Sequence, residues 1–306
     1  MGKKLLRSKF SIVLGLVVEM IAFSILSPVF MSSGNLMDIC LQSSIAALVA
    51  IGMTFVIGTA GIDLSVGSIA ALSGIVTAML LKKKVAVAVA CLLGLALGAV
   101  CGAGNGVLIA GCTLNPFMTT FGMMSILRGL ALMVTEGRAV YGFAPAFRRI
   151  GTGMFGALPA PVVLAAAVAA VGEIVLRKSV LGRYTLAIGD NEEACRLSGV
   201  QVKRYKLAIY AMSGLLAALA GIVLTARVNA AEPLAGYGYE LDAIAAVVLG
   251  GSRFSGGEAS VIGTILGVLF LGTLRNGLTL LNIHSYAQQI VIGVVVILAV
   301  LADRTR

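Results

Sequence analysis

Charged residues are scarce in this sequence. Only 12% of its 306 residues are Asp, Glu, Lys or Arg, whereas a soluble domain carries roughly 25%. Apolar residues make up 59% of the chain, and the mean hydropathy is +1.04. No soluble fold of this length can bury so much apolar surface, so the composition excludes a soluble protein. We therefore expect an integral membrane protein.

Residues that carry metal, redox or nucleotide chemistry are few as well. The chain has one histidine, His284, and no GxxxxGK[ST] phosphate-binding loop. Its cysteines are odd in number, lack CxxC spacing and lie mostly in or beside apolar runs. This pattern indicates packing residues rather than a disulfide framework or a metal site. They are Cys40, Cys91, Cys101, Cys112 and Cys195. We expect this chain to bind no metal or cofactor of its own.

The net charge of +10 does not indicate a nucleic-acid partner. The basic residues cluster at the ends of apolar runs and form no patch interleaved with aromatic residues. Such placement is typical of residues that orient a membrane protein and contact anionic membrane lipid.

The long apolar runs are continuous rather than alternating, which favours helices over a β-barrel. The expected fold class is an all-α integral membrane protein, a polytopic bundle of about ten transmembrane helices. We expect these helices to form a single transmembrane domain over residues 1–306. The runs are residues 10–30, 37–57, 69–81, 85–110, 116–134, 162–176, 207–226, 241–249, 259–274 and 286–301.

The distribution of basic residues predicts the orientation. Four basic residues among residues 3–9 precede the first run, so we expect a retained first helix that starts in the cytoplasm. An even number of spans then places the C-terminus and the polar loop at residues 177–206 in the cytoplasm too. Lys82–Lys84 fall on the opposite side and conflict with the positive-inside rule. A re-entrant hairpin near Asp63 would change the local topology.

Two glycine-rich segments, residues 58–68 and 250–257, interrupt apolar runs in the two halves of the chain. They predict broken or re-entrant helices, and a pair of interrupted helices is a pointer to a translocation path. The candidate residues for this path are Asp63, Ser65, Asn105 and Asn115. For Asp63 we favour a capping role at a helix that begins near Ser65. Helix–helix hydrogen bonds are an equal alternative for the two asparagines.

The loop at residues 177–206 is the longest polar interruption of the chain. Asp190 is predicted to cap a short helix, with Glu193 completing a capping box. Glu192 and Glu193 suit the positive end of the helix dipole, and Gly199 is a typical C-terminal stop. The loop therefore predicts a short helix outside the bilayer that a soluble partner can bind. The alternative is a solvated loop with no partner.

Several motifs resemble those of the membrane subunits of ribose-type sugar ABC importers. Near the first break the chain reads GMTFVI at residues 52–57 and GIDLSVGS at 61–68. The polar loop contains GRY at 182–184, AIGDNE at 187–192 and RLSGV at 196–200, and GYELDAIAAVVLGG follows at 238–251. The resemblance extends over residues 27–302. Glu193–Cys195, where small alanines are usual, and the unusually basic Lys82–Lys84 depart from the family pattern.

The resemblance implies a type II ABC importer-like permease domain that moves a monosaccharide such as ribose into the cytoplasm of a bacterium. It implies a cytoplasmic ABC ATPase that holds ATP and Mg²⁺, an extracytoplasmic sugar-binding protein and a second permease subunit, identical or related. The protein would lie in the plasma (inner) membrane with both termini cytoplasmic, and the chain itself would not be an enzyme.

The same resemblance makes residues 177–206 a cytoplasmic loop with a coupling helix for the ATPase. The residues expected to carry this coupling are Gly182, Arg183, Asp190, Asn191, Glu192, Glu193, Arg196, Leu197, Ser198 and Gly199. Glu240 and Asp242 either contact the binding protein or cap the helix from Leu241, and we favour capping.

A second function remains compatible with the residues. A secondary transporter would be coupled to protons through Asp63, Glu19 or Glu173. Arg128 lies inside an apolar run and needs a partner or an aqueous cavity; Glu173 is a candidate partner.

Overall fold

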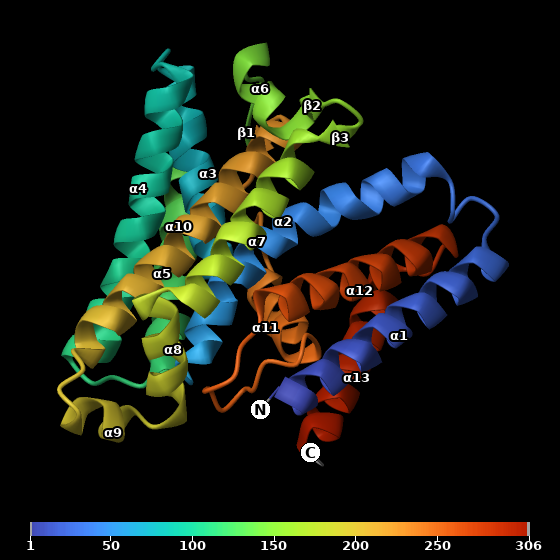
Figure 1. Cartoon of the computed structure of the whole chain (residues 1–306). Helices are drawn as coiled ribbons and strands as arrows, with labels where there is room; N and C mark the ends of the chain where they lie inside the picture. The colour runs from blue at the N-terminus through green and yellow to red at the C-terminus, as the bar shows by residue number, and fades with distance from the viewer. Residues whose placement is uncertain (1, 305–306) are drawn as a thin grey trace.

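The computed structural model describes residues 2–304 and is built of helices (Figure 1). Among the described residues, six helices are long and apolar enough to cross a membrane. They are α2 (Ser33–Gly58), α4 (Val87–Gly106) with its π-helical continuation η1 (Val107–Gly111), α5 (Pro116–Thr135), α7 (Ala160–Lys178), α10 (Val202–Val228) and α12 (Val261–Leu280). The predicted all-α membrane bundle is confirmed.

Four further helices correspond to the remaining predicted runs: α1 (Gly2–Leu26), α3 (Val66–Lys82), α11 (Tyr239–Leu249) and α13 (Ser285–Arg304). The connections contain the short helices α6 (Pro145–Thr152), α8 (Val180–Asp190) and α9 (Glu192–Leu197). Strand β1 (Val140–Tyr141) pairs antiparallel with β4 (Ala230–Ala231), and β2 (Met154–Phe155) with β3 (Leu158–Pro159). Several boundaries differ from the predicted ones, and α10 begins inside the predicted polar loop.

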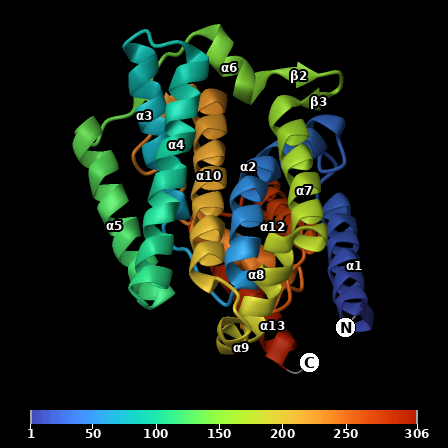
Figure 2. The same cartoon turned by 60° about the vertical axis from the view of Figure 1, so that its left-hand side comes forward.

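Helices α2 and α10 lie at the centre of the bundle. From Ser43 to Gly58 every residue of α2 except Ala46 is buried, so this helix is covered on all sides. A helix that is apolar around its whole circumference has no face for water, which explains its central place. Helices α5 and α1 lie at opposite edges of the molecule (Figure 2).

Glycines along α4 allow it to pack closely on α10, as their spacing predicts. Gly98 lies against Ala218 and Gly214, and Gly102 lies against the backbone of Tyr210. Small residues at every fourth position remove the side chains that would hold two membrane helices apart.

The two ends of the bundle differ. The start of α1 and the end of α13 lie at the same end as α9, whereas the small strands and α6 lie at the other (Figures 1 and 2). Lys82 also belongs to that second end: its Nζ donates to the carbonyl of Gly142 at 3.0 Å and lies 5.9 Å from the Phe143 ring centre. The predicted cytoplasmic ends of the chain, Met1 and residues 305–306, lie outside the described residues.

The substitution Gly102→Ala should destabilise the bundle, because its methyl group would overlap the Tyr210 backbone. Overpacking of this kind costs about 1–3 kcal/mol. Gly104→Ala in the same helix is the matched control, since only the flexible end of Met123 lies near, at 3.8 Å. Thermal unfolding of the detergent-solubilised protein should show a lower midpoint for the first variant alone. Equal midpoints would contradict the close packing of α4 on α10.

Candidate functional site

The polar loop at residues 177–206 folds into two helices, α8 and α9, where one was predicted. Asn191, not Asp190, caps α9: its Oδ1 accepts from the Ala194 amide at 2.9 Å, while Asp190 is the last residue of α8. The predicted capping box of Asp190 and Glu193 is therefore wrong. Asp190 still belongs to helix α8, so α9 begins one residue later than expected and Asn191 is its N-cap.

The other predicted features of α9 are confirmed. Glu192 and Glu193 occupy its first turn, and Gly199 follows its end with φ +81°. Arg196 donates to Glu193 at 2.9 and 2.5 Å, and this hydrogen bonding lowers the pKa of the Glu193 carboxyl. Lys206 at the start of α10 pairs with Glu192 at 2.5 Å.

Side chains of α9 face outward from the bundle. Ser198 is exposed, and Leu197 is 78% exposed, so this leucine packs against little within the described chain. Single exposed apolar side chains are common on protein surfaces, so Leu197 shows that α9 is accessible and not that it binds a partner.

Helix α8 joins α9 to the body of the molecule. Gly182 lies against the last turn of α7, at the carbonyls of Val175 and Leu176, while Arg183 is exposed. The sequence signals for α8 were present: Ser179 accepts from the Gly182 amide as an N-cap, and Thr185 and Ile188 are buried at helical spacing. The polar character of the stretch instead led to its prediction as part of a single loop.

The far end of α8 meets both glycine breaks. Gly189 lies against the backbone of Gly58 and of Gly257, and the Gly257 amide donates to the Gly58 carbonyl at 3.2 Å. Gly256 and Gly257 have φ of +84° and +80°, so the chain needs glycine there to turn. We call residues 58–60, 189–190 and 256–257 the glycine junction. The last turn of α8, directly before α9, therefore contacts both interrupted segments.

The predicted path residues do not all come together. Asp63, Ser65 and Asn105 form one fully buried cluster between α2, α3 and α4. Asp63 accepts from the Ser65 amide at 3.0 Å and from its hydroxyl at 2.6 Å, and Asn105 donates to Ser65 at 2.8 Å. Asn115 is elsewhere, exposed, and caps α5 by accepting from Phe117 at 2.9 Å.

The cluster also binds α10. Ser213 donates to the second Asp63 oxygen at 3.1 Å. Asp63 therefore satisfies the interrupted backbone, as expected, and in addition accepts from the hydroxyl of Ser65, just before α3, and from that of Ser213 in α10. This arrangement is that of a packing centre rather than of an open site.

The candidate pairing of Arg128 with Glu173 is not formed. Arg128 donates to the carbonyls of Pro233 and Ala235, at 2.7 and 2.9 Å, and does not pair with Glu173. Glu173 pairs with Arg177 in its own helix instead.

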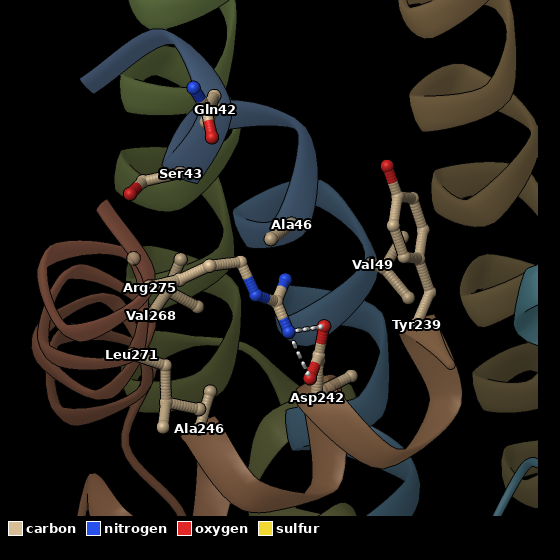
Figure 3. Close-up of a pocket in the computed structure, with 12 residues that line it drawn as sticks. Gln42, Ser43, Ala46, Val49, Tyr239, Asp242, Ala246, Val268, Leu271 and Arg275 are labelled. Atoms are coloured by element: carbon tan, nitrogen blue, oxygen red, sulfur yellow. Dashed lines mark hydrogen bonds and ion pairs between the residues drawn. The ribbon is translucent and has the colours of Figure 1, made fainter. Parts of the chain in front are cut away.

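The acidic residues of α11 also differ from each other. Helix α11 begins at Tyr239, and Glu240 accepts from the Gly238 amide at 3.3 Å, which is a terminal contact of the expected kind. Asp242 does not cap. It pairs with Arg275 of α12 at 3.0 Å, in a small cleft between α2, α11 and α12 (Figure 3).

Replacing Asp63 should test whether its cluster is structural. Asp63→Ala leaves the Ser65 amide and two hydroxyls without their acceptor, at about 1–3 kcal/mol for each buried donor. Asp63→Asn keeps one carbonyl oxygen for Ser65 and should be milder. Thermal unfolding in detergent should therefore rank the two variants below the unmutated protein, Ala lowest. Unchanged unfolding with lost transport in both variants would indicate a role on the path instead.

Comparison with known proteins places the chain among transporters. A family described as "Branched-chain amino acid transport system / permease component" matches residues 35–300. The ribose import permease protein RbsC of Bacillus subtilis (strain 168) is 45% identical over 295 residues, which cover 96% of this chain and 92% of that protein. The ribose import permease of Escherichia coli (strain K12) is 46% identical over 297 residues, with the same coverage of 96% and 92%.

Relatives with other sugars in their names match over similar lengths. The D-allose transport system permease protein AlsC of Escherichia coli (strain K12) is 40% identical, over 92% of this chain and 87% of that protein. No solved structure matches the chain. The family match, the identities to sugar permeases and the membrane-spanning helices agree, and the chain belongs to the family of membrane permease subunits of ribose-type sugar ABC importers.

Proposed function

We propose that this permease subunit carries ribose, or a closely similar monosaccharide, into the cytoplasm of a bacterium, and that a separate ABC ATPase drives it through α9. The observation that carries the proposal is the connection of the exposed helix α9, by way of α8, to the glycine junction. Ribose is favoured because the ribose permeases share 45% and 46% identity with this chain, against 40% for the allose permease.

The two ends of the bundle differ, and we assign a different partner protein to each. The ATPase docks on α9, at the end that also holds the start of α1 and the end of α13 (Figure 2). This end is then cytoplasmic, and the opposite end, with α6 and the small strands, meets the sugar-binding protein. ATP and Mg²⁺ stay on the ATPase. A second permease subunit, identical or related, completes the path across the inner membrane.

The dependence of uptake on ATP or on the proton gradient tests the proposed import. Cells that express this chain with the ATPase and binding protein of its importer should take up radiolabelled ribose, and depletion of ATP should stop uptake. Collapse of the proton gradient at constant ATP should leave it intact. Unlabelled allose and arabinose added in excess should compete less well than ribose. Uptake that survives ATP depletion but stops with the proton gradient would select the proton-coupled alternative.

The role of α9 is tested by Leu197→Asp. Because Leu197 is 78% exposed, this change should leave the fold intact while placing a charge in the interface with the ATPase. Loss of a well-buried interface side chain costs about 2 kcal/mol or more, roughly a 30-fold loss of affinity. Co-purification of the ATPase and ATP-driven uptake should both fall.

The matched control is Leu158→Asp, an exposed leucine of β3 at the opposite end of the molecule. It should leave ATPase binding unchanged. Normal uptake by the Leu197→Asp variant, with the ATPase bound as before, would contradict coupling through α9.

A further inference from the structure

The ion pair of Asp242 and Arg275 lies where a membrane helix would normally carry apolar residues. Arg275 is in the second half of α12, and its side chain is 45% exposed; that of Asp242 is 23% exposed. Asp242 lies in the first turn of α11 and Arg275 one and a half turns before the end of α12. Ionisable side chains within membrane segments mostly face the bundle interior or a water-filled cavity, which favours water or protein over lipid for this face.

Irregular backbone lies beside the pair. Residues 232–238 return from β4 into the bundle, where Gly236 lies against Gly67 in the first turn of α3. The N-termini of two interrupted helices, α3 and α11, thus meet. Arg128 holds this segment through two carbonyls, while Leu234 and Tyr237 on it are 59% and 80% exposed. Non-helical backbone at this depth is stable only when it is covered by protein or lines a water-filled cavity.

The cleft at the ion pair has the groups that bind hydroxyls. Asp242 offers acceptors, Arg275 offers donors, and Gln42 of α2 offers both. In Figure 3 the Asp242 and Arg275 side chains point toward one another, with Gln42 on the neighbouring α2. Gln42 is exposed and has no hydrogen-bond partner within residues 2–304, and the buried Ser43 hydroxyl beside it also lacks one.

The size of the cleft limits its role. Its volume is about 60 Å³, room for a few waters. The cleft does not enclose a monosaccharide by itself, so a sugar that touched it would need a further wall from elsewhere.

We propose that Gln42, Asp242 and Arg275 form a sugar-contacting wall of the translocation path, with water in front of it. This wall replaces the buried Asp63 cluster as the place where sugar meets this subunit. The inference rests on the proposed import of a sugar. The hydroxyl groups of the passing sugar bind these three side chains in turn, and the second permease subunit supplies the facing wall.

The first test measures access to water at Gln42. In a variant whose native cysteines are replaced by serine, Gln42→Cys is exposed to a water-soluble, impermeant methanethiosulfonate in membranes that contain the assembled importer. Val100→Cys is the control, because Val100 is 67% exposed on the apolar outer face of α4. Thiolates form in water and not in hydrocarbon, so Gln42→Cys should react at least about tenfold faster. Ribose supplied with ATP and the binding protein should slow that reaction.

Equal reaction rates at the two positions, or a rate at Gln42→Cys that ribose does not change, would overturn the proposal. The result is separable from the proposed function. Ribose uptake by the unmutated importer tests import itself, and an unreactive Gln42→Cys beside normal ATP-driven uptake contradicts only the wall.

A second test uses uptake. Gln42→Ala should lower the rate of ribose uptake by about tenfold, the effect of one lost hydrogen bond to the sugar. The variant should keep its unfolding temperature, since Gln42 makes no hydrogen bond within residues 2–304. Arg275→Gln should lower uptake further. Full uptake by the Gln42→Ala variant would contradict sugar contact at this wall.

Discussion

Backbone groups that leave a helix inside a membrane have no water to bind, and this requirement organises the molecule around residues 58–65. The carbonyl of Ile62 accepts from the Tyr210 hydroxyl at 3.3 Å, and the Leu64 amide donates to Thr120 at 3.1 Å. The Ser65 amide donates to Asp63 at 3.0 Å. Partners thus come from α10, α5 and the segment itself, so three elements are held together by one interruption.

The same requirement divides the bundle into two regions. On one side, α3, α4 and α10 pack through glycines and the buried Asp63 cluster, and the contact leaves little freedom to move. On the other, α11 packs its buried face, including Ala246, closely against α12, while the loop at residues 232–238 is held partly by Arg128 through two carbonyls. A segment held by few buried apolar contacts and by solvent-accessible polar contacts opens more readily than a closely packed one.

The glycine junction lies between these regions and α9. Gly58, Gly189 and Gly257 approach one another through their backbones. The end of α8 thus contacts both the end of α2 and the loop after α11. A ligand or partner shifts an equilibrium between two states only by its differential affinity for them. In the proposed importer, the ATPase at α9 would supply that difference.

The sequence alone determined the fold class, all ten apolar helices and the existence of a short charged helix before Gly199, because hydropathy and capping are local properties. It gave no account of which polar residues meet. Asp63 and Ser213 are 150 residues apart, Arg128 binds a loop 105 residues away, and Asp242 pairs with Arg275 rather than with its own helix. Tertiary packing decides these partners, because a charged side chain within the bundle pairs with the polar group that the neighbouring segment places beside it.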